Sequence, residues 1–391
     1  MKASGIIAEF NPFHNGHKYI VDIAKCNSDC VVAVISGNYV QRGSPAFFNK
    51  FIRTTAALNC GVDLVIELPS PWSASFAQNF ATGAISILKE LSVSEVYFGA
   101  ECDNLEKLKN IALIDDIKPD VSYKGTYATA RQLSITNKLG SEYSDILNGS
   151  NNNLGIEYIK AANKLSYMVN FIPVKRVGSA HDSDITSGNF SSGSHIRDII
   201  LSDNIALNYV PEECRTLYKQ AIKNKEYISD TKFSNAVISY LKRKSDFTIL
   251  PELSEGIENR LKKAISISNQ YDELLQNIKT KRYTLARVRR LVLSAFLDLD
   301  NYWTHKEVPY LNILGFTKRG EKYLKQCSSG STKPLVFSNK PSTPLSTEVN
   351  KLLNNECIRN DIYMSMLESP IESGSDYTFG IIKENDLDVK N

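Results

Sequence analysis

The first two hundred residues alternate between short apolar runs and longer stretches of helical length. The apolar runs lie at 4–9, 31–36, 62–68, 93–99 and 168–177, and valine and isoleucine are frequent in them. Such runs are typical of strands that are covered on both faces. We expect helices at 16–26 and 73–91, and another that Ser44 and Pro45 begin and that runs through Asn59. Strands separated by helices predict an α/β fold with a doubly wound, Rossmann-like parallel sheet.

The second half has a different pattern. Helical stretches follow one another at 211–224, 232–244, 253–267, 271–278 and 285–299, and the one strand signal lies near 334–337. A chain of 391 residues exceeds one ordinary core. We therefore expect two domains, an α/β domain over 1–203 and a mainly helical domain over 204–391.

Composition narrows the class of protein only a little. The formal net charge is +3, so any surface for nucleic acid must be local. The chain shows no signal-peptide pattern and no apolar run of about 18 residues. Its seven cysteines show no disulfide framework. Cys26 and Cys30 are four apart and could share a helix face as metal ligands, but no second pair and no histidine lies near them. We expect a cytoplasmic protein with reduced thiols, no membrane contact and no structural metal.

The segment after the first strand carries the clearest chemistry. His14 and His17 bracket Gly16, and three positions separate the two imidazoles at the predicted start of a helix. A helix start after the first strand of such a sheet favours phosphate, through its exposed N–H groups and its dipole. Both histidines could stabilise charge that builds on an α-phosphate during in-line attack, and we take them as the catalytic pair. Surface or capping histidines are the alternative.

The order of motifs along the chain resembles a known family. The run FHNGH resembles the H-x-G-H element of the nucleotidylyl-transferase superfamily. Nearly the whole chain is similar to the bacterial tRNA(Met) cytidine acetate ligase family, in the successive motifs GIIAEFNPFHNGH, SGNYVQRGSPA, GVDLVIELP, YFGAE, NNNLGIEYIKA, VKRVG, KRYTLARVRR and YLNILGFTKRG.

The resemblance implies an ATP-dependent ligase. Members of this family activate acetate as acetyl-adenylate, release pyrophosphate and then acetylate the exocyclic amine of the wobble cytidine of elongator tRNA(Met), which gives N4-acetylcytidine. It also implies an ATP site formed by Ile7, Ala8, Glu9, Phe10, Asn11, Pro12, Phe13, His14, Asn15, Gly16, His17, Lys18, Tyr19, Ile20, Gly99, Asn152 and Arg176. Because three asparagines adjoin, Asn151 is an alternative to Asn152. Magnesium is the expected companion of ATP.

A second phosphate cradle is expected at residues 191–197. Hydroxyls and a glycine at a helix start can bind phosphate, although a capping box would use the same residues. The segment resembles the superfamily's serine- and threonine-rich element that ends in isoleucine-arginine, although Gly193 and His195 depart from its commonest form. We add Ser192, Ser194 and Arg197 to the expected ATP site.

A basic run at 279–290 is the candidate surface for RNA. It holds six positive charges and no negative one, while Leu285, Val288, Val292 and Ala295 share one helical face. Arginines that point outward could follow an RNA backbone, and Tyr283 could stack a base. A solvated helix face is the alternative. The expected tRNA-binding residues are Lys279, Lys281, Arg282, Arg287 and Arg290.

Several questions stay open at this point. Gln41, Arg42, Lys50 and Arg53 could hold the triphosphate, hold the tRNA or be solvated. No residue identifies the acetate pocket. A small-metabolite adenylyltransferase and a non-catalytic RNA-binding protein are the alternative functions; the long helical half speaks against the first.

Overall fold

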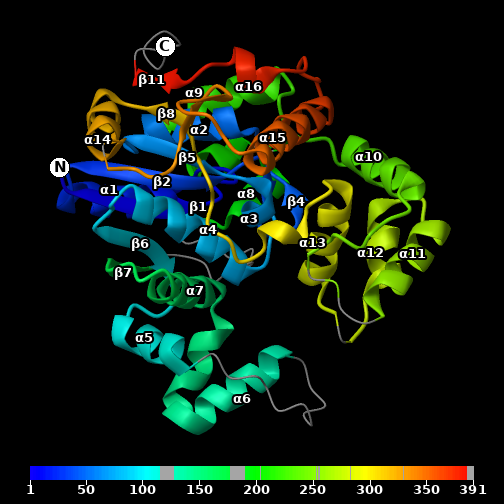
Figure 1. Ribbon diagram of the computed structural model, residues 1–391, viewed down its shortest axis with the longest axis horizontal. Helices are drawn as coiled ribbons and strands as arrows, with labels where there is room; N and C mark the ends of the chain where they lie inside the picture. The colour runs from blue at the N-terminus through cyan, green and yellow to red at the C-terminus, as the bar shows by residue number, and fades with distance from the viewer. Residues whose placement is uncertain are drawn as a thin grey trace.

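The computed structural model describes residues 1–114, 127–176, 190–202, 204–251, 253, 256–281, 283–328 and 330–384. Its centre is a mixed sheet to which nine strands contribute within these ranges (Figure 1). Five parallel strands lie in the order β5 (Leu64–Leu68), β2 (Cys30–Ser36), β1 (Ala3–Ala8), β6 (Glu95–Ala100) and β7 (Asn170–Lys175). They correspond to the five predicted strands, so the expected doubly wound α/β fold is confirmed.

The second half of the chain returns to this sheet. Strand β8 (Leu311–Phe316) runs antiparallel beside β5, and it pairs in turn with β9 (Leu335–Phe337) and β11 (Ile382–Lys383). Strand β10 (Lys340–Pro341) closes that edge. The expected division into domains at residue 203 is therefore wrong, because residues 311–383 complete the sheet of the first half. Of the strands in this half, the sequence predicted only β9, as the strand near 334–337.

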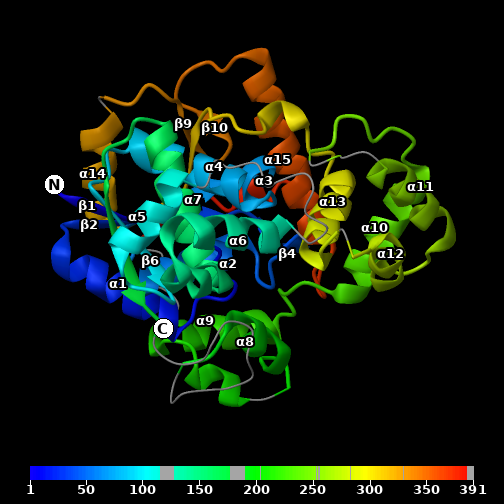
Figure 2. The ribbon, with the colours of Figure 1, turned by 90° about the horizontal axis from the view of Figure 1, so that it is seen from below.

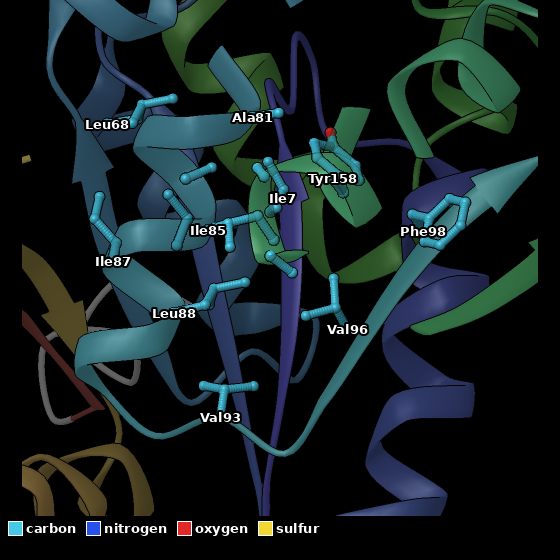
Figure 3. Close-up of a cluster of buried hydrophobic side chains, with 14 of the residues drawn as sticks. Ile7, Leu68, Ala81, Ile85, Ile87, Leu88, Val93, Val96, Phe98 and Tyr158 are labelled. Atoms are coloured by element: carbon cyan, nitrogen blue, oxygen red, sulfur yellow. The ribbon is translucent and has the colours of Figure 1, made fainter. Parts of the chain in front are cut away.

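Helices cover both faces of the sheet. On one face lie α1 (Asn15–Asn27), α2 (Lys50–Asn59), α8 (Gly193–Ile199) and α9 (Glu212–Lys223). On the other lie α4 (Ala77–Glu90), α5 (Leu105–Ile114), α7 (Ser150–Lys164) and α14 (Lys318–Ser328). Figure 3 shows Ile7 and Val96 of the sheet beside Ile85 and Leu88 of α4, with Tyr158 of α7 nearby. Each buried aliphatic side chain of this kind contributes about 1.5–3 kcal/mol.

A compact helical unit lies beside the sheet (Figures 1 and 2). It comprises α10 (Asp230–Arg243), α11 (Ile257–Ile267), α12 (Tyr271–Ile278) and α13 (Leu285–Phe296). These helices share a core that also takes in Tyr39 and Phe51 from the first half and Tyr363 from α15 (Thr347–Ser365). The predicted helical region is thus real, but it is an insertion ahead of the last strands.

Two helix starts differ from their predictions. Ser44–Pro45 forms strand β4, which pairs with β3 (Tyr39–Val40) in a small hairpin. Helix α2 begins at Lys50, because the Asn49 side chain accepts hydrogen bonds from the N–H groups of Phe51 and Ile52 at 3.0 and 2.9 Å. The helix expected at 73–91 begins instead at Ala77 as α4, and the short helix α3 (Ser70–Ser73) precedes it.

The remaining described elements are α6 (Tyr127–Leu139), α16 (Ser375–Thr378) and the 3₁₀ helices Ser141–Asn148, Asn204–Asn208 and Asn301–Trp303. Within the ranges given above, no helix combines the length and the apolar character needed to cross a membrane.

Candidate nucleotide site

A cavity of about 590 Å³ opens at the carboxyl ends of β1, β6 and β7. Strand β1 lies between β2 and β6, so the chain leaves β1 at the point where the strand order reverses. That switch point is where doubly wound sheets bind ligands. Its described lining includes Glu9, His14, Gly16, His17, Gln41, Arg42, Gly99, Asn151, Arg176, Ser192, Ser194, Arg197, Arg289 and Arg290.

The two histidines are fixed by the start of α1. The Nδ1 atom of His14 accepts a hydrogen bond from the Gly16 N–H at 3.1 Å, and the Nδ1 atom of His17 accepts one from the His14 N–H at 3.3 Å. The rings stack with centroids 3.7 Å apart. Since each Nδ1 is an acceptor, the proton of each neutral ring resides on Nε2. Both residues line the cavity, so they can offer Nε2–H groups to an anion.

Both imidazoles are neutral hydrogen-bond donors near neutral pH. Desolvation, followed by the charges of Arg176 and Arg197, lowers the pKa of His14 to about 3. Desolvation, His14 and Arg176 also lower the pKa of His17 well below its ordinary value. The fixed positive charge of the site therefore comes from arginines, while the histidines contribute directed hydrogen bonds.

These lowered pKa values predict a loss of stability in acid. Below about pH 6.5 the unfolded chain protonates His14, whereas the folded protein does so only near pH 3, so the free energy of unfolding falls as pH falls through this window. Urea unfolding at successive pH values should give a slope that His14→Gln reduces by up to about 1.4 kcal/mol per pH unit. An unchanged slope in His14→Gln would contradict the assignment.

Two glycines allow close packing around the histidine loop. A Cβ on Gly16 would lie 3.0 Å from Cε1 of His14, and a Cβ on Gly193 would lie 3.1 Å from the Asn11 carbonyl oxygen. Gly193, which departs from the commonest form of its element, therefore suits the close approach of α8 to the histidine loop. The absence of a side chain on Gly16 therefore also leaves space for the His14 ring.

Part of segment 7–20 supports the loop and does not face the cavity. Pro12, Phe13, Asn15 and Lys18 are absent from the described lining. Phe13 is fully buried, and its N–H donates to the Tyr218 hydroxyl at 3.0 Å. The N–H of Asn15 donates to the Tyr209 carbonyl at 2.9 Å, and Lys18 pairs with Asp22. We interpret these four residues as the frame that holds His14 and His17.

Gly99 and Arg176 meet at the ends of β6 and β7. A Cβ on Gly99 would have ordinary contacts with Ile20 and Arg176, at 3.5 and 3.8 Å. The protein itself would thus tolerate a side chain there, and the demand for glycine would come from a ligand. Both residues line the cavity, as the sequence predicts.

Asn152 lies beneath the cavity wall. Its Oδ1 accepts hydrogen bonds from the N–H groups of Glu101 and Cys102, both at 2.9 Å, and its Nδ2 donates to the Ile146 carbonyl. The side chain is buried and does not belong to the lining, whereas that of Asn151 does. Asn153 also lines the cavity. Between the two asparagines that the sequence left open, the geometry therefore favours Asn151, while Asn152 shapes the turn after β6.

The α8 segment lies against the histidine loop. Arg197 donates from Nη1 to the Asn11 carbonyl at 2.6 Å and from Nη2 to the Ser194 hydroxyl at 3.2 Å. Ser192 caps the helix by accepting from the His195 N–H at 3.2 Å. All three predicted residues of this cradle line the cavity, so capping and phosphate binding are compatible here.

The structure separates the four polar residues whose roles the sequence did not decide into two groups. Gln41 and Arg42 line the cavity, whereas Lys50 and Arg53 are fully buried. Arg53 donates to the carbonyls of Phe48, Glu9, Ser36 and Gly37, and so ties the ends of β1 and β2 together.

Lys50 forms ion pairs with Glu67 at 2.9 Å and Asp376 at 2.7 Å. Burial opposes its charge, but these carboxylates raise the pKa of Lys50 above its ordinary value. Neither Lys50 nor Arg53 is solvated or available to a ligand.

The basic run divides between the cavity and the outer surface. Arg289 and Arg290 of α13 line the cavity together with Ala286, which the sequence pattern did not reveal. Lys279 and Lys281 are exposed, and Arg287 lies 5.1 Å above the Tyr283 ring. Arg282 lies outside the described residues. Tyr283 is buried in the core of the helical unit, so the expectation that it stacks an RNA base is wrong.

The sheet order, the histidine pair at the end of β1 and the arginine-rich cavity define a nucleotide-binding protein of the nucleotidyl-transferase class. Residues 1–376 match the family model described as HIGH Nucleotidyl Transferase. The chain belongs to this family and, within it, to the tRNA(Met) cytidine acetate ligases.

The second assignment comes from relatives of nearly equal length. The chain is 34% identical to the tRNA(Met) cytidine acetate ligase of Thermoanaerobacter sp. (strain X514), over 97% of this chain and 99% of the relative. It is 35% identical to that of Caldanaerobacter subterraneus subsp. tengcongensis, over 98% and 100%. These matches confirm the family that the motifs suggested.

Solved structures agree with the sequence relatives. The apo crystal structure of Thermotoga maritima TmcAL superposes with a TM-score of 0.89 at 27% identity, over 98% of this chain and 99% of the other. The same enzyme bound with alpha-thio ATP gives a TM-score of 0.88 at the same identity and coverage. A neighbour with this architecture thus binds an ATP analogue.

Proposed function

We propose that this protein is an ATP-dependent tRNA(Met) cytidine acetate ligase. It would join acetate to the α-phosphate of ATP, release pyrophosphate, and pass the acetyl group to the exocyclic amine of the wobble cytidine of elongator tRNA(Met). The stacked His14–His17 pair, with both Nε2 atoms available as donors at the switch point of the sheet, is the observation that carries the proposal.

The cavity offers a separate surface for each part of ATP. Gly99 and Arg176 would border the adenosine, and the charges of both Arg176 and Arg197 act on His14. Ser192, Ser194 and Arg197 would bind the β- and γ-phosphates through hydroxyl and guanidinium groups. Attack by an acetate oxygen on the α-phosphate would build negative charge next to the two Nε2–H donors, and these would stabilise it without accepting a proton.

Magnesium would accompany the triphosphate. Glu9 is the only carboxylate among the described lining residues, and Mg²⁺ is often held by one carboxylate together with substrate phosphates. The ion would neutralise part of the phosphate charge, while Glu9 also accepts a hydrogen bond from the Gln41 N–H at 3.0 Å.

The RNA would approach along the helical unit. Lys279, Lys281 and Arg287 lie before or within α13, and Arg289 and Arg290 continue the positive charge to the cavity wall. A cytidine that enters the cavity from this side would place its flanking phosphates near basic side chains. Acetate would lie beside the α-phosphate.

Incubation with ATP, labelled acetate and tRNA tests the proposal. Acetyl-adenylate should form without tRNA, and digestion of the RNA product should give N4-acetylcytidine, which mass spectrometry detects. An adenylylated metabolite whose formation ignores tRNA would instead show a small-metabolite adenylyltransferase. RNA binding with no ATP-dependent product would show a non-catalytic protein.

Neutralising the outer basic residues should weaken tRNA binding and reduce its dependence on salt. Each phosphate contact contributes about 0.7 to 0.9 to the slope of log affinity against log salt, so Lys279→Gln, Lys281→Gln and Arg287→Gln together should lower its magnitude by about 2. Filter binding at several salt concentrations measures the slope. Lys325→Gln on α14 is the control. If the triple variant kept the slope of the wild type, Lys279, Lys281 and Arg287 would not contact the RNA.

A further inference from the structure

Arg42 reaches the cavity from the loop of the β3–β4 hairpin. Its Nη1 donates to the Ser194 hydroxyl at 2.9 Å, and Nη2 of Arg197 donates to the same oxygen at 3.2 Å. Two guanidinium groups from segments more than 150 residues apart therefore meet at one hydroxyl of the cavity wall. Ser194 is also one of the expected phosphate-binding residues, so Arg42 lies where the β- and γ-phosphates would be bound.

The charges around this point favour an anion. The described lining holds one carboxylate, Glu9, and six basic side chains, namely Arg42, Arg176, Lys175, Arg197, Arg289 and Arg290. A triphosphate fits this balance because guanidinium groups bind phosphate oxygens through paired, charge-assisted hydrogen bonds.

The loop that carries Arg42 is held at both sides. On one side, the Gln41 N–H donates to the Glu9 carboxylate at 3.0 Å at the end of β1. On the other, the backbone of Gly43 lies directly against α13, because a Cβ there would be 2.6 Å from the Arg290 nitrogen and 2.7 Å from the Arg289 carbonyl carbon. Gly43 also has a φ of +80°, which favours glycine. The Tyr271 hydroxyl, from the helical unit, donates a hydrogen bond to the Gly43 carbonyl at 3.4 Å.

We propose that Arg42 is a catalytic residue that binds the pyrophosphate portion of ATP together with Arg197, and that α13 of the helical unit positions it through Gly43. The inference rests on the proposed function for the identity of the reaction. An acetate oxygen forms the new bond to the α-phosphorus, the bond from that phosphorus to the bridging oxygen breaks, and the electron pair leaves with pyrophosphate. Arg42 neutralises the charge that grows on this leaving group.

Arg42→Ala is the direct test. We expect its affinity for ATP and for pyrophosphate, measured by calorimetry, to fall about 10- to 100-fold, as for the loss of charged hydrogen bonds. The kcat of acetate-dependent exchange of labelled pyrophosphate into ATP should fall as well, in addition to the loss of ATP affinity. The affinity for tRNA, measured without ATP, should stay unchanged. Arg42→Lys should recover part of the binding as a point charge, and Arg243→Ala, an exposed arginine of α10, is the matched control.

The outcomes separate this inference from the proposed function. If the wild-type protein binds ATP but shows no acetate-dependent exchange, the proposed reaction fails, and the nucleotide affinities alone decide the role of Arg42. Unchanged affinities in Arg42→Ala would overturn the inference. So would a loss confined to tRNA binding, which would make Arg42 an RNA contact.

Gly43→Ala tests the positioning by α13. Its Cβ would meet backbone atoms, so the hairpin or the helix must shift and displace the Arg42 side chain. We expect its exchange activity to fall nearly as far as that of Arg42→Ala, and the double variant to be no worse than either single one. Circular dichroism and thermal unfolding verify that the variant is folded. Additive losses, or full activity in folded Gly43→Ala, would contradict the positioning role.

Discussion

His17→Ala should reduce acetyl-adenylate formation about 100- to 1,000-fold while leaving tRNA affinity intact. The alanine removes one of two preorganised donors at the α-phosphate, and the loss of one such donor costs about this factor. Acetate-dependent pyrophosphate exchange measures the first effect and filter binding measures the second. His17→Gln, whose amide nitrogen extends to about the position of Nε2, should recover part of the rate.

The matched control is His305→Ala, because His305 is a histidine outside the described cavity lining. It should retain full exchange activity. A variant of His17 that lost exchange and tRNA binding to the same degree would contradict the division of labour between the histidine loop and the basic helix. Full exchange activity in His17→Ala would remove the histidine pair from the reaction.

The largest expected effect on stability is that of Arg53→Met. Its guanidinium group is fully buried and donates to four backbone carbonyls, which would lose these donors in the variant. Loss of a buried, hydrogen-bonded charge of this kind costs about 3–5 kcal/mol. Urea unfolding should show a decrease of this size, and the ends of β1 and β2 should lose their fixed separation.

Arg53→Lys keeps the charge but lacks the fork of donors, so it should also be destabilised, though less than Arg53→Met. Arg243→Ala, at an exposed position of α10, should stay within about 0.5 kcal/mol of the wild type. A change of less than 1 kcal/mol in Arg53→Met would show that the carbonyls find other donors, and our account of the residue would fail.

The strands and the histidine loop could be predicted because their signals are local. Runs such as 31–36 record burial on both faces of a sheet, and a pair of histidines after the first strand records a helix start that is suited to phosphate. Local signals fail where two readings share one pattern. Ser44–Pro45 fits a helix start as well as a short strand, and only the side-chain cap of Asn49 decides between them.

Residue type also decides little where burial depends on distant partners. Lys50 and Arg53 look like surface cations, but Glu67 and Asp376 pair with the first and four carbonyls satisfy the second. Tyr283 beside a basic run suggests an RNA contact, yet the packing of the helical unit buries its ring. Nothing near these residues in the sequence distinguishes a solvated charge from one that is paired inside the protein.

By itself, the sequence determined the five parallel strands, the position of the histidine pair and the family to which the chain belongs. Periodicity and short motifs suffice for these because they depend on neighbours a few residues away. Only the tertiary structure decided that β8 completes the sheet and that α13 forms a wall of the cavity. It also decided that Arg42 meets Ser194. These contacts join residues more than 150 positions apart, and no local pattern encodes which distant surfaces will pack together.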